Sequence, residues 1–566
     1  MNKTKGFFRN TAIMFISMFI VKAMGAVLKI PLGNILGGEG MGYFSTAFSI
    51  FSPVLAFTAS GVPAIVTQLT AQKAAKGMFS EILDIRRSAL ILSLISGIIG
   101  TSLIYIIALP FTYYIANSPE SLMSVLFIAP SVFFCSIAAV YRGYYEGLSD
   151  MLPTALSQVI ESVVKAAVGV GLSYYVYGVC IKEFGSEEKA LPYAAAAAIL
   201  GVTASELCGM VYLFIRSRKH EFDVHKPVHK FSVTETLSLV KELFINSLPV
   251  AMGAVLANLI SFTDLLTVSN CINLSYHFFP DQLIGGSIKM SELDAGISDP
   301  GNFLYGSYSG IVMSVYLLTA TLPLLIARCS LPRLVCTIEL NKDTDTMPII
   351  RDTTVMLKAT MLIAAPVSMF MAILSEPILR ILYPVREMEA IVGTVPLQLL
   401  SVGGIFAALQ GSLASIFQAY GDFKTPLKIT LAGGLVKFVL NVVLLMLPNI
   451  NISGAALATS AANLFDTFYI LRLLKKKFAL KFPLSDIFFP PVISAAVSAL
   501  AGFYAYNAFS TEFAPIVSVI FTVLSGGLLY LLILFIADSG ELFRIISILR
   551  DKNAEKSCKL RENVVK

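Results

Sequence analysis

Two lysines in the first apolar stretch of the chain are the residues best suited to chemistry. Lys22 lies about eleven residues, or about 17 Å of helix, inside that stretch, which is too deep for its side chain to reach the interface. An ionisable group at the centre of a membrane helix costs about 2.5–3.5 kcal/mol, so its position needs a reason. Lys29 follows two turns later on nearly the same face, close to Gly25 and Gly33. Two cations on a face of small residues predict a site for a pyrophosphate or an acidic sugar. The alternative is that both lysines pair with acids on neighbouring helices, with Asp264 the obvious partner.

Other ionisable residues also fall within apolar stretches. Glu161 and Lys165 are four residues apart, so a structural pair within one helix is the favoured interpretation, and Lys165 is also a candidate for the anionic group. Lys437 has two glycines a turn earlier and no such partner, which favours a side chain that faces a cavity. Asp264, and after it Glu161, are candidates for a counter-ion or for coupling to protons or sodium. The sequence predicts no catalytic residue, no cofactor and no metal site.

The elements that must position these residues are membrane helices. Hydrophobic residues make up 56% of the 566 positions and charged residues 14%, against roughly 25% charged residues in soluble domains, and the mean hydropathy is +0.77. Apolar stretches of about 18 residues or more recur along the chain, each long enough to cross about 30 Å of hydrocarbon. We predict an all-α integral membrane protein of about fourteen transmembrane helices. They are placed at residues 11–36, 42–72, 88–115, 121–146, 152–179, 192–215, 244–270, 303–329, 350–375, 394–420, 425–447, 452–474, 486–507 and 513–537.

The distribution of basic residues predicts the orientation. With the N-terminus inside, most of the 42 Lys and Arg residues fall in cytoplasmic connections, as the positive-inside rule expects. The outer connections hold Lys182, Lys189, Lys289, Arg380 and Arg386. We therefore predict a multi-pass protein of the cell membrane with both termini cytoplasmic. The basic runs at 216–230 and 475–481 are interpreted as topology anchors near anionic lipid, and no nucleic-acid partner is predicted.

The chain contains an internal repeat. Residues 200–207 align without gaps with residues 457–464, and Lys165 corresponds, within one residue, to Lys437. The connection before each lysine carries the same pair of residue types, Gly147 and Pro153 in one half and Gly421 and Pro426 in the other. The alternative is that short apolar matches arise by chance, but their common order argues against it.

The repeat predicts the domain organisation. Residues 1–240 form an N-terminal six-helix lobe, residues 241–478 a C-terminal six-helix lobe, and residues 479–566 two additional transmembrane helices with a cytoplasmic tail. Six is an even number, so the repeats are parallel and are related by an axis along the membrane normal. Two such lobes enclose a central cavity, and rocking them gives alternating access.

Several segments resemble a known family. Residues 22–29 followed by residues 37–43, the Gly61-Val62-Pro63 turn and the start of the helix at residues 454–459 are similar to polysaccharide exporters. These belong to the multidrug/oligosaccharidyl-lipid/polysaccharide flippase superfamily. Within it the chain looks most like the stage V sporulation protein B-like members, which are related to lipid II flippases.

The resemblance implies two six-helix lobes, two extra helices and a cationic cavity that accepts a polyprenyl-pyrophosphate-linked glycan or peptidoglycan precursor. Basic residues of the first helix line that cavity in lipid II flippases, and Lys22 and Lys29 fall in similar places, as Lys where Arg is usual. An Arg of helix eight in the lipid II group has no match around residues 305–308, which favours the broader polysaccharide-exporter interpretation. A role in spore cortex formation, and contacts with membrane lipids and envelope-synthesis proteins, are also implied.

Three alternative functions are open. The first is a multidrug exporter of the same superfamily, driven by sodium or protons. The second is a membrane glycan polymerase or ligase, for which Arg380 and Arg386 beside an outer Tyr-Pro pair are weak support. The third is a scaffold for envelope synthesis that transports nothing. Two lysines in the first helix favour an anionic cargo, so we expect a flippase and no enzyme.

Overall fold

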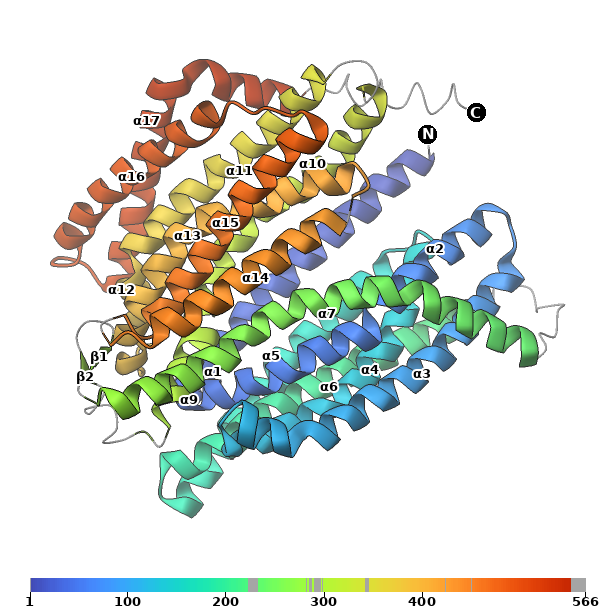
Figure 1. The fold of residues 1–566 in the computed structure, drawn as a ribbon, viewed down its shortest axis with the longest axis horizontal. Coiled ribbons are helices and arrows are strands. Elements are labelled where there is room, and N and C mark those ends of the chain that lie inside the picture. Colours follow the sequence, from blue (N-terminus) through green and yellow to red (C-terminus); the bar gives the residue numbers. More distant parts are fainter. Residues whose placement is uncertain are drawn as a thin grey trace. The chain divides into compact units, whose positions relative to one another are not determined.

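The structure, a computed structural model, describes residues 2–221, 233–280, 282–284, 288–289, 297, 299–341, 346–422, 424–448 and 450–550. Nearly all of this part of the chain is helical (Figure 1). It divides into two compact units. The N-terminal unit comprises Met1–Gln282 and Lys289–Ser314, and the C-terminal unit comprises Leu283–Ile288 and Val315–Lys566.

The N-terminal unit is built from long helices joined by short connections. Its elements are α1 (Asn2–Ala59), α2 (Gly61–Ala75), α3 (Phe79–Pro110), η1 (Phe111–Ile115), η2 (Pro119–Ser121), α4 (Leu122–Gly147), α5 (Leu152–Phe184), α6 (Glu187–Glu221), α7 (Val233–Phe278), α9 (Pro300–Gly306) and η3 (Ser307–Val312). The segments η1 and η3 are turns of π-helix. Helix α6 packs against both α4 and α5, so these three helices form one bundle.

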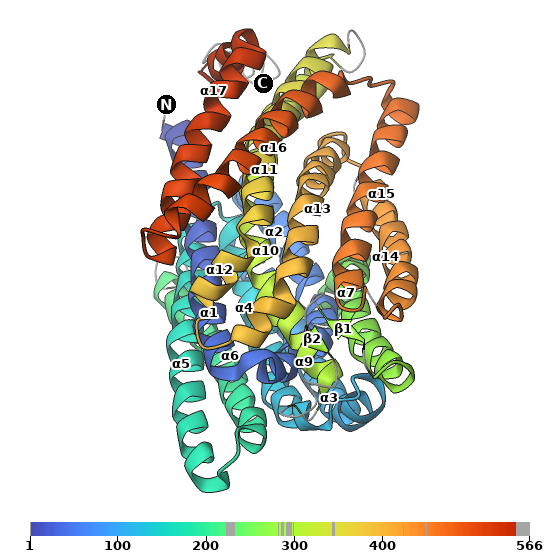
Figure 2. The same cartoon turned by 90° about the vertical axis from the view of Figure 1, so that its left-hand side faces the viewer.

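The C-terminal unit is also built from helices joined by short connections. Its elements are α10 (Met313–Asn341), α11 (Met347–Ile373), α12 (Ser375–Leu382), α13 (Glu387–Ala419), α14 (Lys424–Leu445), α15 (Ser453–Phe478), α16 (Leu484–Phe509) and α17 (Pro515–Arg550). Two short strands, β1 (Leu283–Ile284) and β2 (Ile288–Lys289), pair at the unit boundary. Helices α16 and α17 lie side by side next to α11 (Figure 2), where the ring of Phe370 fits against Gly502 and Gly526.

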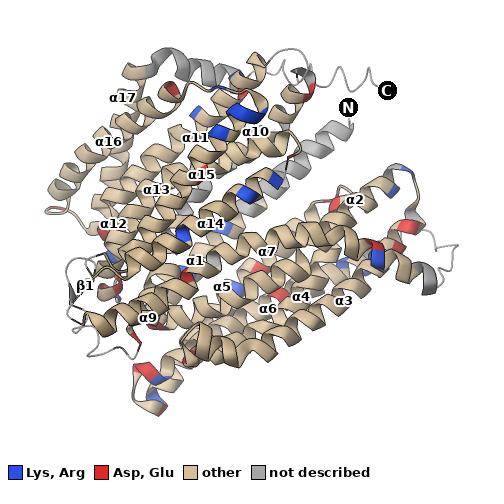
Figure 3. Ribbon diagram, viewed as in Figure 1, with Lys and Arg blue, Asp and Glu red and all other residues tan. Residues whose placement is uncertain are grey.

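The predicted class, an all-α integral membrane protein, is confirmed. In the described part of the chain, eleven helices are long and apolar enough to cross a membrane. The predicted spans 11–36 and 42–72 count as one of these, Ile20–Ala74, because α1 continues into the second span and α2 completes it. The predicted spans 303–329 and 452–474 are helical, as α9 to α10 and as α15, but are not among the eleven. Charged residues are sparse along the helices (Figure 3).

The first helix is bent where the sequence predicts a boundary. Gly37 has φ 60° and ψ −167° inside α1, a conformation that favours glycine. Just beyond it, α1 crosses α9 very closely. A Cβ on Gly42 would lie 2.6 Å from the carbonyl oxygen of Asn302, and one on Gly306 would lie 2.7 Å from the Cα of Gly42. Glycine at these positions lets the two backbones touch, and the bend separates the part of α1 that carries Lys22 and Lys29 from the part fixed to α9.

Packing within each unit follows the sequence repeat. The hydroxyl of Thr203 donates to the carbonyl of Phe127 at 2.6 Å, and the hydroxyl of Ser460 donates to that of Leu399 at 3.0 Å. Thr203 and Ser460 are equivalent in the ungapped alignment of the two halves. The α4–α6 and α13–α15 interfaces are therefore matched in register, which favours the repeat over chance similarity. The domain boundaries drawn after residues 240 and 478 stay a prediction.

Candidate functional site

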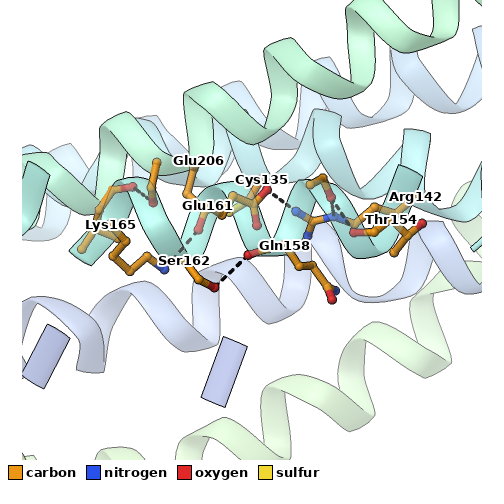
Figure 4. A network of polar contacts seen from close by, with 11 residues as sticks. Cys135, Arg142, Thr154, Gln158, Glu161, Ser162, Lys165 and Glu206 are labelled. Atoms are coloured by element: carbon orange, nitrogen blue, oxygen red, sulfur yellow. Dashed lines mark hydrogen bonds and ion pairs between the residues drawn. The ribbon is translucent and has the colours of Figure 1, made fainter. Parts of the chain in front are cut away.

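A network of charged residues joins three helices of the N-terminal unit. Arg142 of α4 forms an ion pair with Glu161 of α5 and donates to Ser157 at 3.2 Å. Lys165, one turn after Glu161, lies with its Nζ atom 3.5 Å from Glu206 of α6. These side chains converge between α4, α5 and α6 (Figure 4). Each acid of the network therefore has a cation from a neighbouring helix.

The interpretation of Glu161 and Lys165 as a pair within one helix does not describe the observed contacts. Both residues sit on α5, but Glu161 pairs with α4 and Lys165 with α6. The sequence pattern did not identify the two observed partners, which are Arg142, near one end of its predicted span, and Glu206. Their presence in apolar stretches was the signal that could have identified them, since a buried charge calls for an opposite one.

The network is balanced in charge. Two cations and two carboxylates meet, and Glu206 also accepts a bond from the thiol of Cys135 at 2.9 Å. Glu161 and Glu206 are both at most 8% exposed. Breaking such a buried pair by removing one partner costs about 3–5 kcal/mol, because the other charge is left uncompensated. The arrangement fixes α4, α5 and α6 to one another and leaves little negative charge to bind a cation.

Glycine makes room for the acid on α5. A Cβ built on Gly209 of α6 would lie 2.6 Å from the Cδ atom of Glu161, so only a glycine permits the approach. The C-terminal unit holds a similar contact, in which a Cβ on Gly433 of α14 would lie 2.6 Å from the Cγ atom of Asp466 of α15. The second acid accepts a hydrogen bond at 2.6 Å from Gln410 of α13.

Lys437 and Asp264 are both buried. Lys437 lies on α14, one turn after Gly433, and is 7% exposed. Asp264 lies on α7 and is 8% exposed. Its charge acts on Tyr305, whose hydroxyl is 3.0 Å from that of Ser49. Both Lys437 and Asp264 make polar interactions of their own.

Lys22 and Lys29 lie together on the first part of α1. Lys22 is exposed and Lys29 is half-buried, and the charge of Lys22 acts on Lys29. Neither forms an ion pair with any described residue of the N-terminal unit, Asp264 included. A Cβ built on Gly25, between the two lysines, would have no atom within 4 Å. Gly25 therefore borders open space, and whether that space receives a substrate stays a prediction.

The predicted site residues thus fall into separate groups. Glu161 and Lys165 belong to one network, Lys22 and Lys29 share a face of α1, and Asp264 lies on α7. Lys437 lies in the other unit, close in sequence to the glycine that receives Asp466. Lys437 is buried, and its role toward a cavity stays a prediction. The sequence pattern did not single out Arg142 or Asp466 as site residues.

Comparison with known proteins agrees with this architecture. Residues 7–335 match the family described as polysaccharide biosynthesis protein, and residues 349–443 match the MatE family. The chain is 27% identical over 452 residues to the uncharacterized membrane protein YabM of Bacillus subtilis (strain 168), covering 80% of this chain and 76% of that protein. It is 25% identical over 463 residues to stage V sporulation protein B of the same organism, covering 80% of each.

The fold is shared with solved membrane transporters. The chain matches the lipid II flippase MurJ in an inward closed conformation with a TM-score of 0.67 and 16% sequence identity, covering 94% of this chain and 100% of that one. At that identity the likeness establishes the fold. The family match, in contrast, spans more than half of the sequence. The protein is therefore a multi-pass membrane protein of the polysaccharide biosynthesis protein family, within the multidrug/oligosaccharidyl-lipid/polysaccharide flippase superfamily.

Proposed function

We propose that the protein translocates a polyprenyl-pyrophosphate-linked oligosaccharide or peptidoglycan precursor across the cytoplasmic membrane by alternating access. The observation that carries this proposal is the pair Lys22 and Lys29, which have no carboxylate partner among the described residues of their unit. Gly25, between them in the sequence, borders open space. An ammonium group that deep in an apolar helix is costly unless an anion or water meets it. A pyrophosphate supplies two negative charges to meet the two ammonium groups.

The relatives support the same class of cargo. One is named a stage V sporulation protein and another, over 47% of this chain, a lipid II flippase. The proposal for this chain extends to spore cortex formation, to contact with envelope-synthesis proteins, and to cytoplasmic N- and C-termini. Lys165 and Lys437 are assigned supporting roles toward the anionic head group, and Asp264 and Glu161 are assigned roles as counter-ions.

A catalytic role receives less support. Arg380, the outer residue that a glycan ligase would use, is 2.9 Å from Glu387 and 3.0 Å from Glu376 on the surface. Its charge is therefore shared with two exposed carboxylates. We propose that the protein moves its substrate without altering it.

The proposal is tested with purified protein in proteoliposomes that carry a defined polyprenyl-pyrophosphate-linked glycan. Transbilayer movement is measured by the accessibility of the sugar to an impermeant label. Wild-type protein should accelerate movement, Lys22→Ala with Lys29→Ala should abolish the acceleration, and Lys76→Ala, which removes an exposed lysine at the end of α2, should leave it intact. Equal rates with and without wild-type protein would refute the proposal.

A multidrug exporter is the second candidate, because residues 349–443 match the MatE family. Export of cationic dyes from cells separates the two. The flippase proposal predicts no change in dye export on Lys22→Ala, whereas a drug exporter whose cavity becomes less positive should export a cationic dye faster.

A further inference from the structure

Asp466 is a buried acid whose surroundings differ from those of Glu161 and Glu206, each of which pairs with a cation. It is 4% exposed, and its Oδ2 atom accepts a hydrogen bond from Gln410 at 2.6 Å. Its Oδ1 atom lies against the backbone of Gly433, is buried, and makes no hydrogen bond. One oxygen of this carboxyl group is thus shielded from water and left without a donor.

No positive charge compensates Asp466 within the described part of its unit. On α13 it faces the neutral Gln410, and on α14 it faces Gly433. Lys437 is one turn further along α14, but Asp466 forms no ion pair with it. Within a turn on α15 itself the polar neighbours are Asn463, Thr467 and Tyr469, none of which carries a positive charge. An ionised carboxylate in such a place is strongly disfavoured, so the group must take up a cation or a proton.

The repeat shows that this imbalance belongs to one unit. In the register that pairs Lys165 with Lys437, Glu161 corresponds to Gly433, and in the ungapped alignment Gly209 corresponds to Asp466. The same contact between an acid and a glycine therefore occurs in both units. In the N-terminal unit the acid is on the first helix of the pair and the glycine on the second, and in the C-terminal unit the order is reversed. In the N-terminal unit the acid has the guanidinium of Arg142, whereas the C-terminal unit offers only an amide.

A proton fits the site better than a metal ion. Hard cations take about six oxygen ligands, but Asp466 contacts one side-chain amide and a glycine backbone. Across the described residues there is no group of three His, Cys, Asp or Glu side chains placed to hold a metal ion. A proton needs only the single oxygen atom, Oδ1, that has no donor.

We propose that Asp466 is a proton-binding site that couples proton movement to translocation. The carboxyl group is neutral while α13, α14 and α15 are packed as described. When these helices part and water enters, the O–H bond breaks, the electron pair stays on Oδ1, and the proton passes to water. The coupling rests on the proposed function, whereas the proton-binding site itself does not.

The site is tested first without any substrate. Infrared spectra of the full-length protein in lipid nanodiscs report the C=O stretch of neutral carboxyl groups. At neutral pH the wild type should show such a band, Asp466→Asn should remove it, and Asp486→Asn, which deletes an exposed carboxylate of the same unit, should retain it. Gln410→Leu should shift the band, because the hydrogen bond to Oδ2 is lost. That variant assigns the band even if Asp466→Asn does not fold.

The coupling is tested in proteoliposomes with a polyprenyl-pyrophosphate-linked glycan. A pH gradient should raise the wild-type flipping rate several-fold, and Asp466→Asn should flip at a rate independent of the gradient. The absence of a neutral-carboxyl band in the wild type, its persistence in Asp466→Asn, or its loss on adding sodium at constant pH would overturn the proton site. A band that behaves as expected in a protein that flips no glycan would instead overturn the proposed function.

Discussion

The carboxyl group of Glu161 on α5 touches the backbone of Gly209 on α6. A Cβ at that glycine would lie 2.6 Å from Cδ of the acid, so no larger residue fits without displacing the side chain. In the C-terminal unit the acid and the glycine change places, as Asp466 and Gly433. In both units, two closely packed helices hold an acid at their interface. The chemistry of that acid depends on the side chain that a third helix places beside it.

Gly209→Ala should destabilise the N-terminal unit. The added methyl group meets Glu161, which cannot turn away without breaking its pair with Arg142, and overpacking of this kind costs about 1–3 kcal/mol. Gly171→Ala is the matched control, since a Cβ there would meet nothing within 4 Å. Thermal unfolding in detergent measures both. A loss of stability as large for Gly171→Ala as for Gly209→Ala would contradict the prediction.

Arg142→Gln should destabilise the protein more than the removal of both charges of the pair. The single variant leaves Glu161 buried without its cation and should cost about 3–5 kcal/mol. The double variant Arg142→Gln with Glu161→Gln removes both charges and should recover part of that loss. A double-mutant cycle on the free energy of unfolding tests this, and strictly additive effects would show that the two residues do not interact.

Lys22→Arg should keep flippase activity that Lys22→Ala loses. A charged hydrogen bond contributes about 1.5–3 kcal/mol, so removing one ammonium group should raise the KM for a pyrophosphate-linked glycan about tenfold or more. Arg keeps the charge and adds a fork that suits phosphate oxygens. Initial flipping rates over a range of glycan concentrations give KM. An unchanged KM in Lys22→Ala would exclude this residue from the head-group site.

The pair formed by Asp422 and Lys477 should make stability depend on pH in the acid range. Burial alone would raise the pKa of Asp422, but bonds from Lys477 at 2.5 Å and from Thr425 outweigh it and hold the pKa at about 2. A carboxyl group whose pKa is lowered on folding stabilises the protein above its unfolded value of 3.8. That contribution is lost as the pH falls toward 2.

Lys477→Met should therefore lower stability at neutral pH, and the difference from wild type should shrink below about pH 4. The lysine is half exposed, so the effect should be below about 1 kcal/mol. Lys476→Met is the control, because this neighbour forms no ion pair with a described residue. Melting temperatures across that pH range decide it. Equal losses in the two variants at every pH would rule out the pair as the cause.

How far the sequence alone predicts the site depends on the residue. Lys22 and Lys29 could be recognised because depth in an apolar stretch and a seven-residue spacing are properties of one helix. The partner of Glu161 could not be recognised in this way, because two cations were possible partners, Lys165 on the same helix and Arg142 on another. Local spacing favoured the first, whereas the packing of α4 against α6 and of α6 against α5 brings the second into contact.

The sequence by itself determined that the chain is a helical membrane protein and where most of its helices lie. It also determined that the two halves are related. Both follow from the order of residues alone, because hydrophobicity and the alignment of the halves are properties of the linear sequence. Only the tertiary structure decided which buried charges are compensated. Glu161 meets a guanidinium and Asp466 meets an amide, and that difference arises from side chains of separate helices that become neighbours only when the helices pack.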